Sequence, residues 1–274
     1  MSVFDEPKID THCHVLDPAR FPYAPDVAYR PAGQEVAPLE QYLQLMQAYG
    51  IRHALFVGPN SGYGLDNRCL LDALLRGAGR FKGIAVVRND TDRDALMRLR
   101  EAGVIGVAFN ATVMGVAHYA NTAPLLRTLA ELDMLLSLQV EHDQMVALRA
   151  LVEQSGVRTL VDHGGRPAAG RGVDQPGFQA LLAMARTGRV AVKLSGYQKF
   201  SALPPPYDDT RPFIDALLEA YTLDACLWAS DWPFLKAPQR LDVGPLLRQV
   251  ERLLPGAADR RKLLWETPRR WLGF

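Results

Sequence analysis

Two histidines separated by one residue stand near the start of the chain, in the segment Ile9-Asp10-Thr11-His12-Cys13-His14. If this segment is a strand, side chains alternate between its two faces, so His12 and His14 point the same way and Cys13 points the other way. Two imidazoles side by side supply half of a metal site, or a pair of groups that transfers protons. The alternative is that the two histidines are unrelated residues of an N-terminal loop.

Short apolar runs alternate with amphipathic segments along the rest of the chain. We expect strands near residues 8–16, 53–58, 81–87, 104–110, 135–141, 159–162, 190–195 and 226–230. We expect helices near residues 39–49, 66–76, 92–102, 123–132, 143–154, 177–187, 212–221, 243–254 and 259–272. Apolar strands that alternate with amphipathic helices indicate a parallel sheet covered by helices. Eight such units in 274 residues predict an α/β fold, a single (β/α)8 TIM barrel that spans residues 1–274 as one domain. A doubly wound open sheet is the alternative fold.

Composition narrows the function classes. Hydrophobic residues make up 48% of the chain and charged residues 22%, which is typical of a soluble globular protein. The net charge of +1 gives no indication of a nucleic-acid or membrane partner. Three scattered cysteines argue against a disulfide framework, and the N-terminus lacks the pattern of a signal peptide. We therefore expect a cytoplasmic protein whose partner is a small molecule, and the oligomeric state stays open.

Polar side chains stand at or just beyond the C-terminal ends of almost all expected strands. In a (β/α)8 barrel these ends share one mouth, where active sites lie. The residues concerned are His12, His14, Asn60, Ser61, Asn110, Gln139, Glu141, His163, Arg166, Lys193, Ser195, Lys199 and Asp231. Each also has a purely structural interpretation: His163 as a hydrogen-bonded core residue, Asp231 as a turn cap, and Lys193 as a structural or solvated charge. His53, His118 and His142 receive no role.

Four of these segments occur in a characteristic order: Asp10-Thr11-His12-Cys13-His14, His163-Gly164-Gly165-Arg166-Pro167, Val192-Lys193-Leu194-Ser195-Gly196 and Ser230-Asp231-Trp232-Pro233. Together they resemble the amidohydrolase superfamily, and within it the TIM-barrel branch typified by 2-pyrone-4,6-dicarboxylate lactonase. The segment from Gly64 to Arg68 and the terminal segment from Arg261 to Leu272 are also similar, so the resemblance spans the whole chain. It implies a hydrolase of a lactone or cyclic ester in aromatic catabolism.

This chain departs from the family pattern at positions that concern the metal and the substrate. The decarboxylase branch has a histidine ligand at the end of strand five, where this chain has Gln139, a poor zinc ligand. The lactonase branch is described as working without a metal. Its arginines on strand four and in the following loop correspond here to Ala108 and Met114, and a third arginine corresponds to Lys199. Because arginine binds carboxylates bidentately and these residues do not, we expect a related lactone, with one carboxylate.

The resemblance implies a role for each candidate residue. Asp231 would take a proton from water and return it to the leaving oxygen, while His12, His14 and His163, with Arg166, polarise the carbonyl. The substrate-binding candidates are Arg166, Gln139, Asn110, Lys199, Arg30 and Arg68, and the loop from Pro18 to Pro38 would partly close the mouth.

Two other functions stay open. The first is a mononuclear zinc hydrolase or non-oxidative decarboxylase, in which His12, His14, His163 and Asp231 hold the metal. The second is an inactive ligand-binding barrel, since fold and motifs alone do not establish turnover. The interpretation we favour needs no cofactor.

Overall fold

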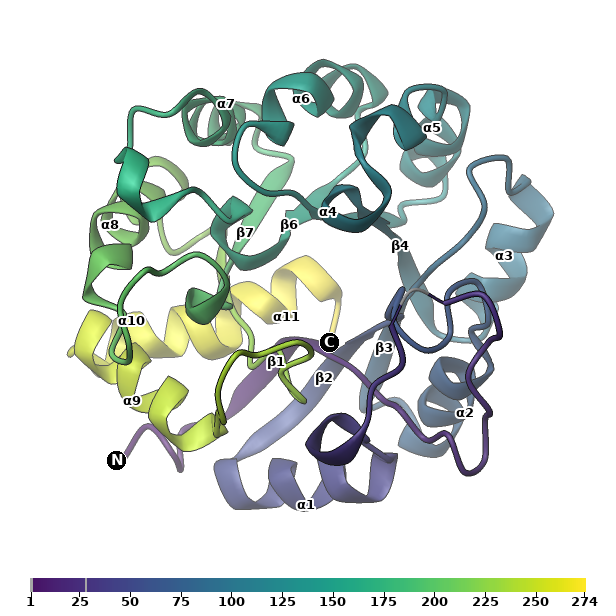
Figure 1. Cartoon of the computed structure of the whole chain (residues 1–274), viewed down its shortest axis with the longest axis horizontal. Coiled ribbons are helices and arrows are strands. Elements are labelled where there is room, and N and C mark those ends of the chain that lie inside the picture. The colour runs from purple at the N-terminus through teal and green to yellow at the C-terminus, as the bar shows by residue number, and fades with distance from the viewer. Residues whose placement is uncertain (1, 28) are drawn as a thin grey trace. The chain divides into compact units, whose positions relative to one another are not determined.

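The computed structural model of the protein describes residues 2–27 and 29–274. One sheet holds eight strands in the order β1 to β8 (Figure 1). The pairs β1–β2, β2–β3, β4–β5, β5–β6 and β6–β7 are parallel. The strands are β1 (Lys8–Cys13), β2 (Ile51–Val57), β3 (Phe81–Ala85), β4 (Val104–Asn110), β5 (Leu135–Gln139), β6 (Thr159–Val161), β7 (Val190–Leu194) and β8 (Cys226–Trp228).

Helices follow the strands along the chain. They are α1 (Leu39–Tyr49), α2 (Arg68–Gly77), α3 (Arg93–Glu101), α4 (Ala111–Met114), α5 (Ala123–Glu131), α6 (Gln144–Ser155), α7 (Pro176–Met184), α8 (Arg211–Tyr221), α9 (Val243–Leu253), α10 (Ala257–Arg261) and α11 (Thr267–Leu272). Eight parallel strands in chain order with interleaved helices are the (β/α)8 architecture, so the predicted fold class is confirmed. Among the described residues, no helix has both the length and the apolar character needed to cross a membrane.

Most element boundaries lie within a few residues of those expected, and α1 and β4 match them fully. The predicted terminal helix over residues 259–272 is interrupted: a π-helical turn over Lys262–Glu266 separates α10 from α11. Pro268 occupies the first turn of α11, and because proline has no amide hydrogen it cannot continue a regular α-helical hydrogen-bond ladder. The first strand ends at Cys13, three residues earlier than residue 16, its predicted end.

The chain forms two compact units. Unit 1 comprises residues 1–86, 102–104 and 227–274, and unit 2 comprises residues 87–101 and 105–226. The expectation of one domain stays a prediction.

An aromatic cluster organises the core of unit 1. The ring of Tyr42, on α1, lies 5.1 Å from that of Phe56 on β2 and 5.3 Å from that of Trp232, as measured between centroids. All three side chains are buried. Burying such a side chain contributes about 1.5–3 kcal/mol, so this cluster fixes α1 against β2 and against the segment that follows β8.

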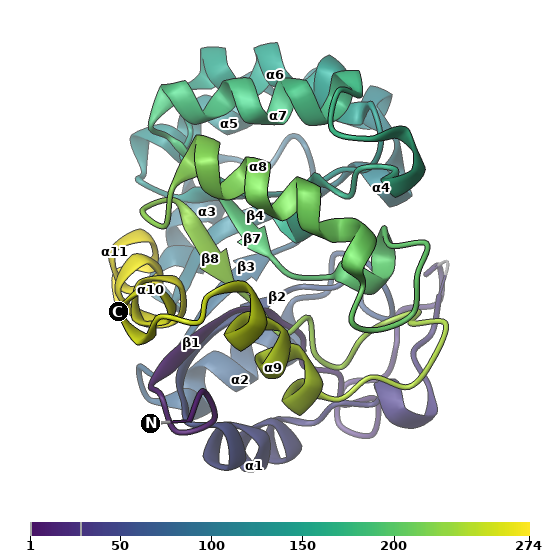
Figure 2. The ribbon, with the colours of Figure 1, turned by 90° about the vertical axis from the view of Figure 1, so that its left-hand side faces the viewer.

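Unit 2 contains β5, β6 and β7, with apolar residues such as Leu138, Leu160 and Val192 fully buried along them. Helices α6 and α7 lie side by side (Figure 2). Phe178 of α7 packs edge-on against Phe213 of α8, with 5.1 Å between the ring centroids. This contact packs α7 against α8.

Candidate active site

The two histidines of the first motif face one carboxylate in unit 1. His12 lies on β1 and His14 directly follows it. The Nε2 atoms of both rings are 3.9 Å from Oδ1 of Asp231, and all three side chains are buried. The rings are almost perpendicular, with 4.9 Å between their centroids. The prediction that both imidazoles point the same way is therefore confirmed.

A backbone contact fixes the protonation of His14 at one nitrogen. Its Nδ1 lies 2.7 Å from the carbonyl oxygen of Val57, at the end of β2. A carbonyl only accepts hydrogen bonds, so Nδ1 must carry a hydrogen and donate it. The nitrogen that gains or loses a proton is therefore Nε2, which is the atom nearest Asp231. An imidazole oriented in this way suits either proton transfer or metal binding.

Backbone contacts hold Asp231 beside these histidines. Its amide donates to the carbonyl oxygen of His12 at 2.8 Å, and the amide of His14 donates to Trp232 O, also at 2.8 Å. Asp231 has a φ of +61°, in the left-handed region that costs a non-glycine residue about 1–2 kcal/mol. Backbone strain of this kind is found at functional sites, where the surrounding contacts maintain it.

A second carboxylate, Asp10, forms hydrogen bonds both within β1 and to the segment that follows β8. It is fully buried and accepts hydrogen bonds from Ser230, Tyr42 and the amide of His12. Burial raises the pKa of Asp10, and these hydrogen bonds partly counteract that effect. The sequence placed Asp10 in a motif but gave it no role.

In unit 2, His163 follows β6 and packs tightly against Ser195 and Gly196. Its Nδ1 is 3.0 Å from the hydroxyl oxygen of Ser195, and its side chain is fully buried. A Cβ on Gly196 would lie 2.7 Å from Cγ and Nδ1 of His163, closer than real Cβ contacts allow. Gly196 also has a φ of +64°. Ser195, after β7, is therefore the hydrogen-bond partner of this imidazole, and position 196 must be glycine because any side chain there would clash with it.

The same turn positions Arg166. Residues 163–166 all have positive φ, and the carbonyl oxygen of Arg166 accepts from the amide of His142 at 3.0 Å. The Arg166 Nη2 atom lies 3.0 Å from Oε2 of Glu141, and both side chains are partly exposed. The arginine predicted to hold a substrate anion thus has a carboxylate beside it, from the loop just after β5.

A short hydrogen-bond chain joins the ends of β4 and β5. The hydroxyl of Thr112 donates to Oδ1 of Asn110 at 2.7 Å and accepts from Nε2 of Gln139 at 3.1 Å. Asn110 Oδ1 also accepts from the amide of Val113 at 3.2 Å, so it caps α4. Two predicted substrate-binding residues, Asn110 and Gln139, are therefore connected through Thr112, which was not among the predicted site residues.

The other candidates lie in different surroundings. Lys193 is fully buried and forms an ion pair of 2.8 Å with Asp162, so it is a structural charge and not a solvated one. Arg30 is exposed and donates to Pro25 O at 3.0 Å, while Arg68 pairs with Asp66 and is 70% exposed. Lys199 ends the turn Tyr197–Lys199 and is partly exposed.

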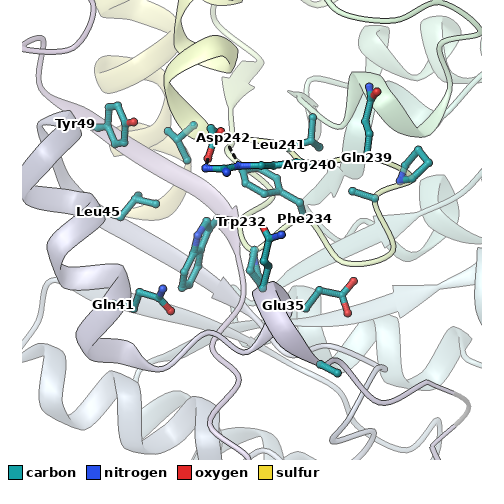
Figure 3. Close-up of a pocket in the computed structure, with 16 residues that line it drawn as sticks. Glu35, Gln41, Leu45, Tyr49, Trp232, Phe234, Gln239, Arg240, Leu241 and Asp242 are labelled. Carbon is teal, nitrogen blue, oxygen red and sulfur yellow. Dashed lines mark hydrogen bonds and ion pairs between the residues drawn. The ribbon is translucent and has the colours of Figure 1, made fainter.

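A cavity of about 590 Å³ opens in unit 1 beside the segment that follows Asp231 (Figure 3). Trp232 and Phe234 line it from that segment, and Leu45 and Tyr49 line it from α1. None of the predicted catalytic or substrate-binding residues is among the described residues that line it. Its lining mixes apolar rings with groups of both charges.

A family model described as Amidohydrolase matches residues 9–274. The 4-sulfomuconolactone hydrolase of Rhizobium radiobacter is 35% identical over 271 residues, which are 96% of this chain and 89% of that protein. The 2-pyrone-4,6-dicarboxylate hydrolase of Comamonas testosteroni is 29% identical over 281 aligned positions, 96% of this chain and 88% of that protein. Both relatives are named as lactone hydrolases.

Solved structures agree with the fold. A candidate 2-pyrone-4,6-dicarboxylic acid hydrolase from Pseudomonas putida has a TM-score of 0.85 at 32% identity, over 97% of each chain. An amidohydrolase from Burkholderia multivorans with bound zinc has a TM-score of 0.72 at 20% identity, over 97% of this chain and 99% of that one.

Proposed function

Because this chain belongs to the amidohydrolase family, we propose that it hydrolyses a lactone or cyclic ester that carries an anionic group. The observation that carries this proposal is the buried carboxylate of Asp231, 3.9 Å from two imidazole nitrogens. A proton acceptor beside groups that can become cations is what ester hydrolysis by water requires. The names of the relatives, which are lactone hydrolases, support the substrate class.

Asp231 acts as the general base in this mechanism. Its carboxylate takes a proton from water as the water oxygen attacks the carbonyl carbon of the lactone. The bond between that carbon and the ring oxygen then breaks, and the proton passes from Asp231 to the leaving oxygen. The product is an open-chain carboxylic acid with a hydroxyl or tautomeric keto group.

The imidazoles stabilise the negative charge that develops on the carbonyl oxygen. A hydrogen-bond donor placed where negative charge develops lowers the energy of the transition state. Nε2 of His14 carries the exchangeable proton, since Nδ1 is committed to Val57 O. In a (β/α)8 barrel all strand ends face one mouth, and on that ground we propose that His163 and Arg166 act on the same substrate.

A zinc ion is the alternative, and part of the donor set fits it. His12, His14 and Asp231 offer two imidazole nitrogens and a carboxylate oxygen, which zinc accepts, and His163 would be a further ligand. A metal bound there would polarise the carbonyl and lower the pKa of a bound water. At the end of β5, however, Gln139 offers an amide whose nitrogen donates to Thr112, so the histidine ligand of the decarboxylase branch is replaced. We therefore propose catalysis without a metal.

Substrate selection follows from residues on β4 and in α4. The positions that carry arginines in the lactonase branch hold Ala108 and Met114, which cannot bind a carboxylate. We predict weak or no activity on 2-pyrone-4,6-dicarboxylate, measured as kcat/KM with that compound. A value of about 10⁵ M⁻¹s⁻¹ or more, typical of efficient enzymes, would show that other residues hold both of its carboxylates.

The test of the proposed function is a panel of lactones monitored with a pH indicator, since each hydrolysis releases a carboxylic acid. The panel includes sulfonated and carboxylated muconolactones, 2-pyrone-4,6-dicarboxylate and uncharged lactones of the same ring size. We expect turnover of at least one anionic lactone and slower turnover of its uncharged counterpart. Tight binding of these compounds without acid release would instead indicate an inactive binding protein.

A further inference from the structure

Asp10 connects the strand that carries His12 to the segment that carries Asp231, both in unit 1. Its Oδ1 accepts from the amide of Ser230 at 2.9 Å and from the amide of His12 at 3.3 Å. Its Oδ2 accepts from the hydroxyl of Ser230 at 2.5 Å and from the hydroxyl of Tyr42 at 2.9 Å. One buried carboxylate thus joins β1, α1 and the segment after β8.

These contacts lie next to the two groups that the proposed mechanism uses. Ser230 immediately precedes Asp231, and its hydroxyl also accepts from the amide of Trp232 at 3.0 Å. The Asp10–Ser230 contact therefore holds the residues on both sides of Asp231. On the other side, Asp10 holds the amide of His12, whose carbonyl accepts from the amide of Asp231. Moving Asp10 would therefore shift Asp231 relative to the imidazoles.

We propose that Asp10 is a positioning residue, which sets the distance between the Asp231 carboxylate and the imidazoles of His12 and His14 without contacting substrate. This inference rests on the proposed function, because it assigns Asp10 a role in that reaction. Its geometric part concerns only unit 1 and can be tested without turnover.

The donors around Asp10 allow two variants that separate the charge of its side chain from its contacts. The two amides that reach Oδ1 can only donate, whereas the two hydroxyls that reach Oδ2 can also accept. In Asp10→Asn the amide oxygen keeps both backbone donors, and its NH₂ group faces the two hydroxyls, so all four contacts survive without the charge. Asp10→Ala removes all four contacts.

Thr11 provides a matched control. Its hydroxyl donates to Trp228 O at 2.8 Å, a fully buried hydrogen bond between β1 and the end of β8, close to Ser230 in the sequence. Thr11 alternates with Asp10 and His12 along the strand, and its contact does not reach Ser230 or Asp231. Thr11→Val therefore removes a comparable link between these strands without touching the alignment of the site.

The experiment measures kcat and KM of the four proteins on the best lactone, together with the imidazole NMR signals of histidine-labelled protein. We expect Asp10→Ala to lower kcat by about 10–100-fold with KM changed less, since small misplacements of reacting groups cost about that much. Asp10→Asn should keep kcat within about threefold and Thr11→Val within about twofold of the original. The His12 and His14 signals should move in Asp10→Ala and stay in Thr11→Val.

Several results would overturn the inference. Retained kcat in Asp10→Ala, or an equal loss in Thr11→Val, would mean that Asp10 contributes stability alone. An equal loss in Asp10→Asn would mean that its charge matters and not its geometry. If Asp10→Ala does not fold, Ser230→Ala takes its place with the same expectations. If the original protein turns over no lactone, the proposed function fails, while unmoved histidine signals in Asp10→Ala would refute the positioning role separately.

Discussion

At the scale of single residues, the site depends on small side chains that hold larger ones. Gly196 illustrates this dependence, because the imidazole of His163 lies directly against its Cα. We predict that Gly196→Ala displaces His163 from Ser195 and lowers kcat by about 10–100-fold, the range expected when a catalytic group is misplaced. Steady-state kinetics and a melting curve measure the two effects.

Gly188→Ala separates this effect from backbone strain. Gly188 has a φ of +65°, almost the same as that of Gly196, but a Cβ there would meet nothing within 4 Å. Its variant should lose only the stability that the strained backbone costs, and it should keep its kcat. Equal loss of kcat in both variants would show that contact with His163 is not what Gly196 provides.

Residue types at strand ends made part of the site predictable. His12, His14 and Asp231 stood out because histidines and carboxylates rarely gather at the ends of apolar strands without a function. The roles of Thr112 and of Asp10 were not predictable, because a hydrogen bond between side chains depends on how strands align in space. The Glu141–Arg166 ion pair escaped prediction for the same reason.

At the scale of elements, the loop after β1 is fastened to the segment after β8. Glu35 accepts hydrogen bonds from the hydroxyl of Tyr29 and from the amide of Lys236, the latter at 2.6 Å. The Lys236 ammonium also lies 4.7 Å from the centre of the Tyr29 ring. These contacts hold the loop from Pro18 to Pro38, which we predicted to close the mouth in part.

Glu35→Ala should loosen this loop, because it removes both hydrogen bonds at once. We predict faster chymotrypsin cleavage after Tyr29, whose hydroxyl loses its partner, and a higher KM for the lactone, with a smaller change in kcat. Glu40→Ala is the control, since Glu40 pairs with Arg76 on the exposed side of α1. Cleavage at the original rate would mean that the Glu35 contacts do not restrain the loop.

Element boundaries were predictable wherever local signals were strong. The helix α1 ends at Gly50, which adopts the left-handed conformation common at helix ends. The terminal helix was predicted as continuous because its apolar pattern continues through Pro268. The π-helical turn was not predictable from that pattern, because it is a change in the backbone hydrogen bonds and not in the side chains.

At the scale of the whole molecule, the alternation of strands and helices was sufficient to predict the strand order. A parallel sheet requires crossover connections, and each expected helix supplied one. The substrate was not predictable to the same degree, since it depends on a few side chains such as Ala108 and Lys199 and not on the architecture.

Whether the reaction requires a metal is tested on the whole purified protein. We predict that protein purified without added zinc contains well below one equivalent of metal, as measured by elemental analysis. Its kcat on the best lactone should be unchanged after treatment with a chelator. Loss of activity on chelation, followed by recovery when zinc is added, would favour the metal-dependent alternative with His12, His14, His163 and Asp231 as ligands.

The most direct test of the central claim is the turnover of Asp231→Asn on the best anionic lactone. Asparagine keeps the shape of the side chain and cannot take a proton, so the variant should fold normally and bind substrate. We predict that its kcat falls by about 10²–10⁴, the usual contribution of a general base, with KM changed little. Near-normal turnover by a folded variant would contradict the account, because the proton of the attacking water would then go to another group.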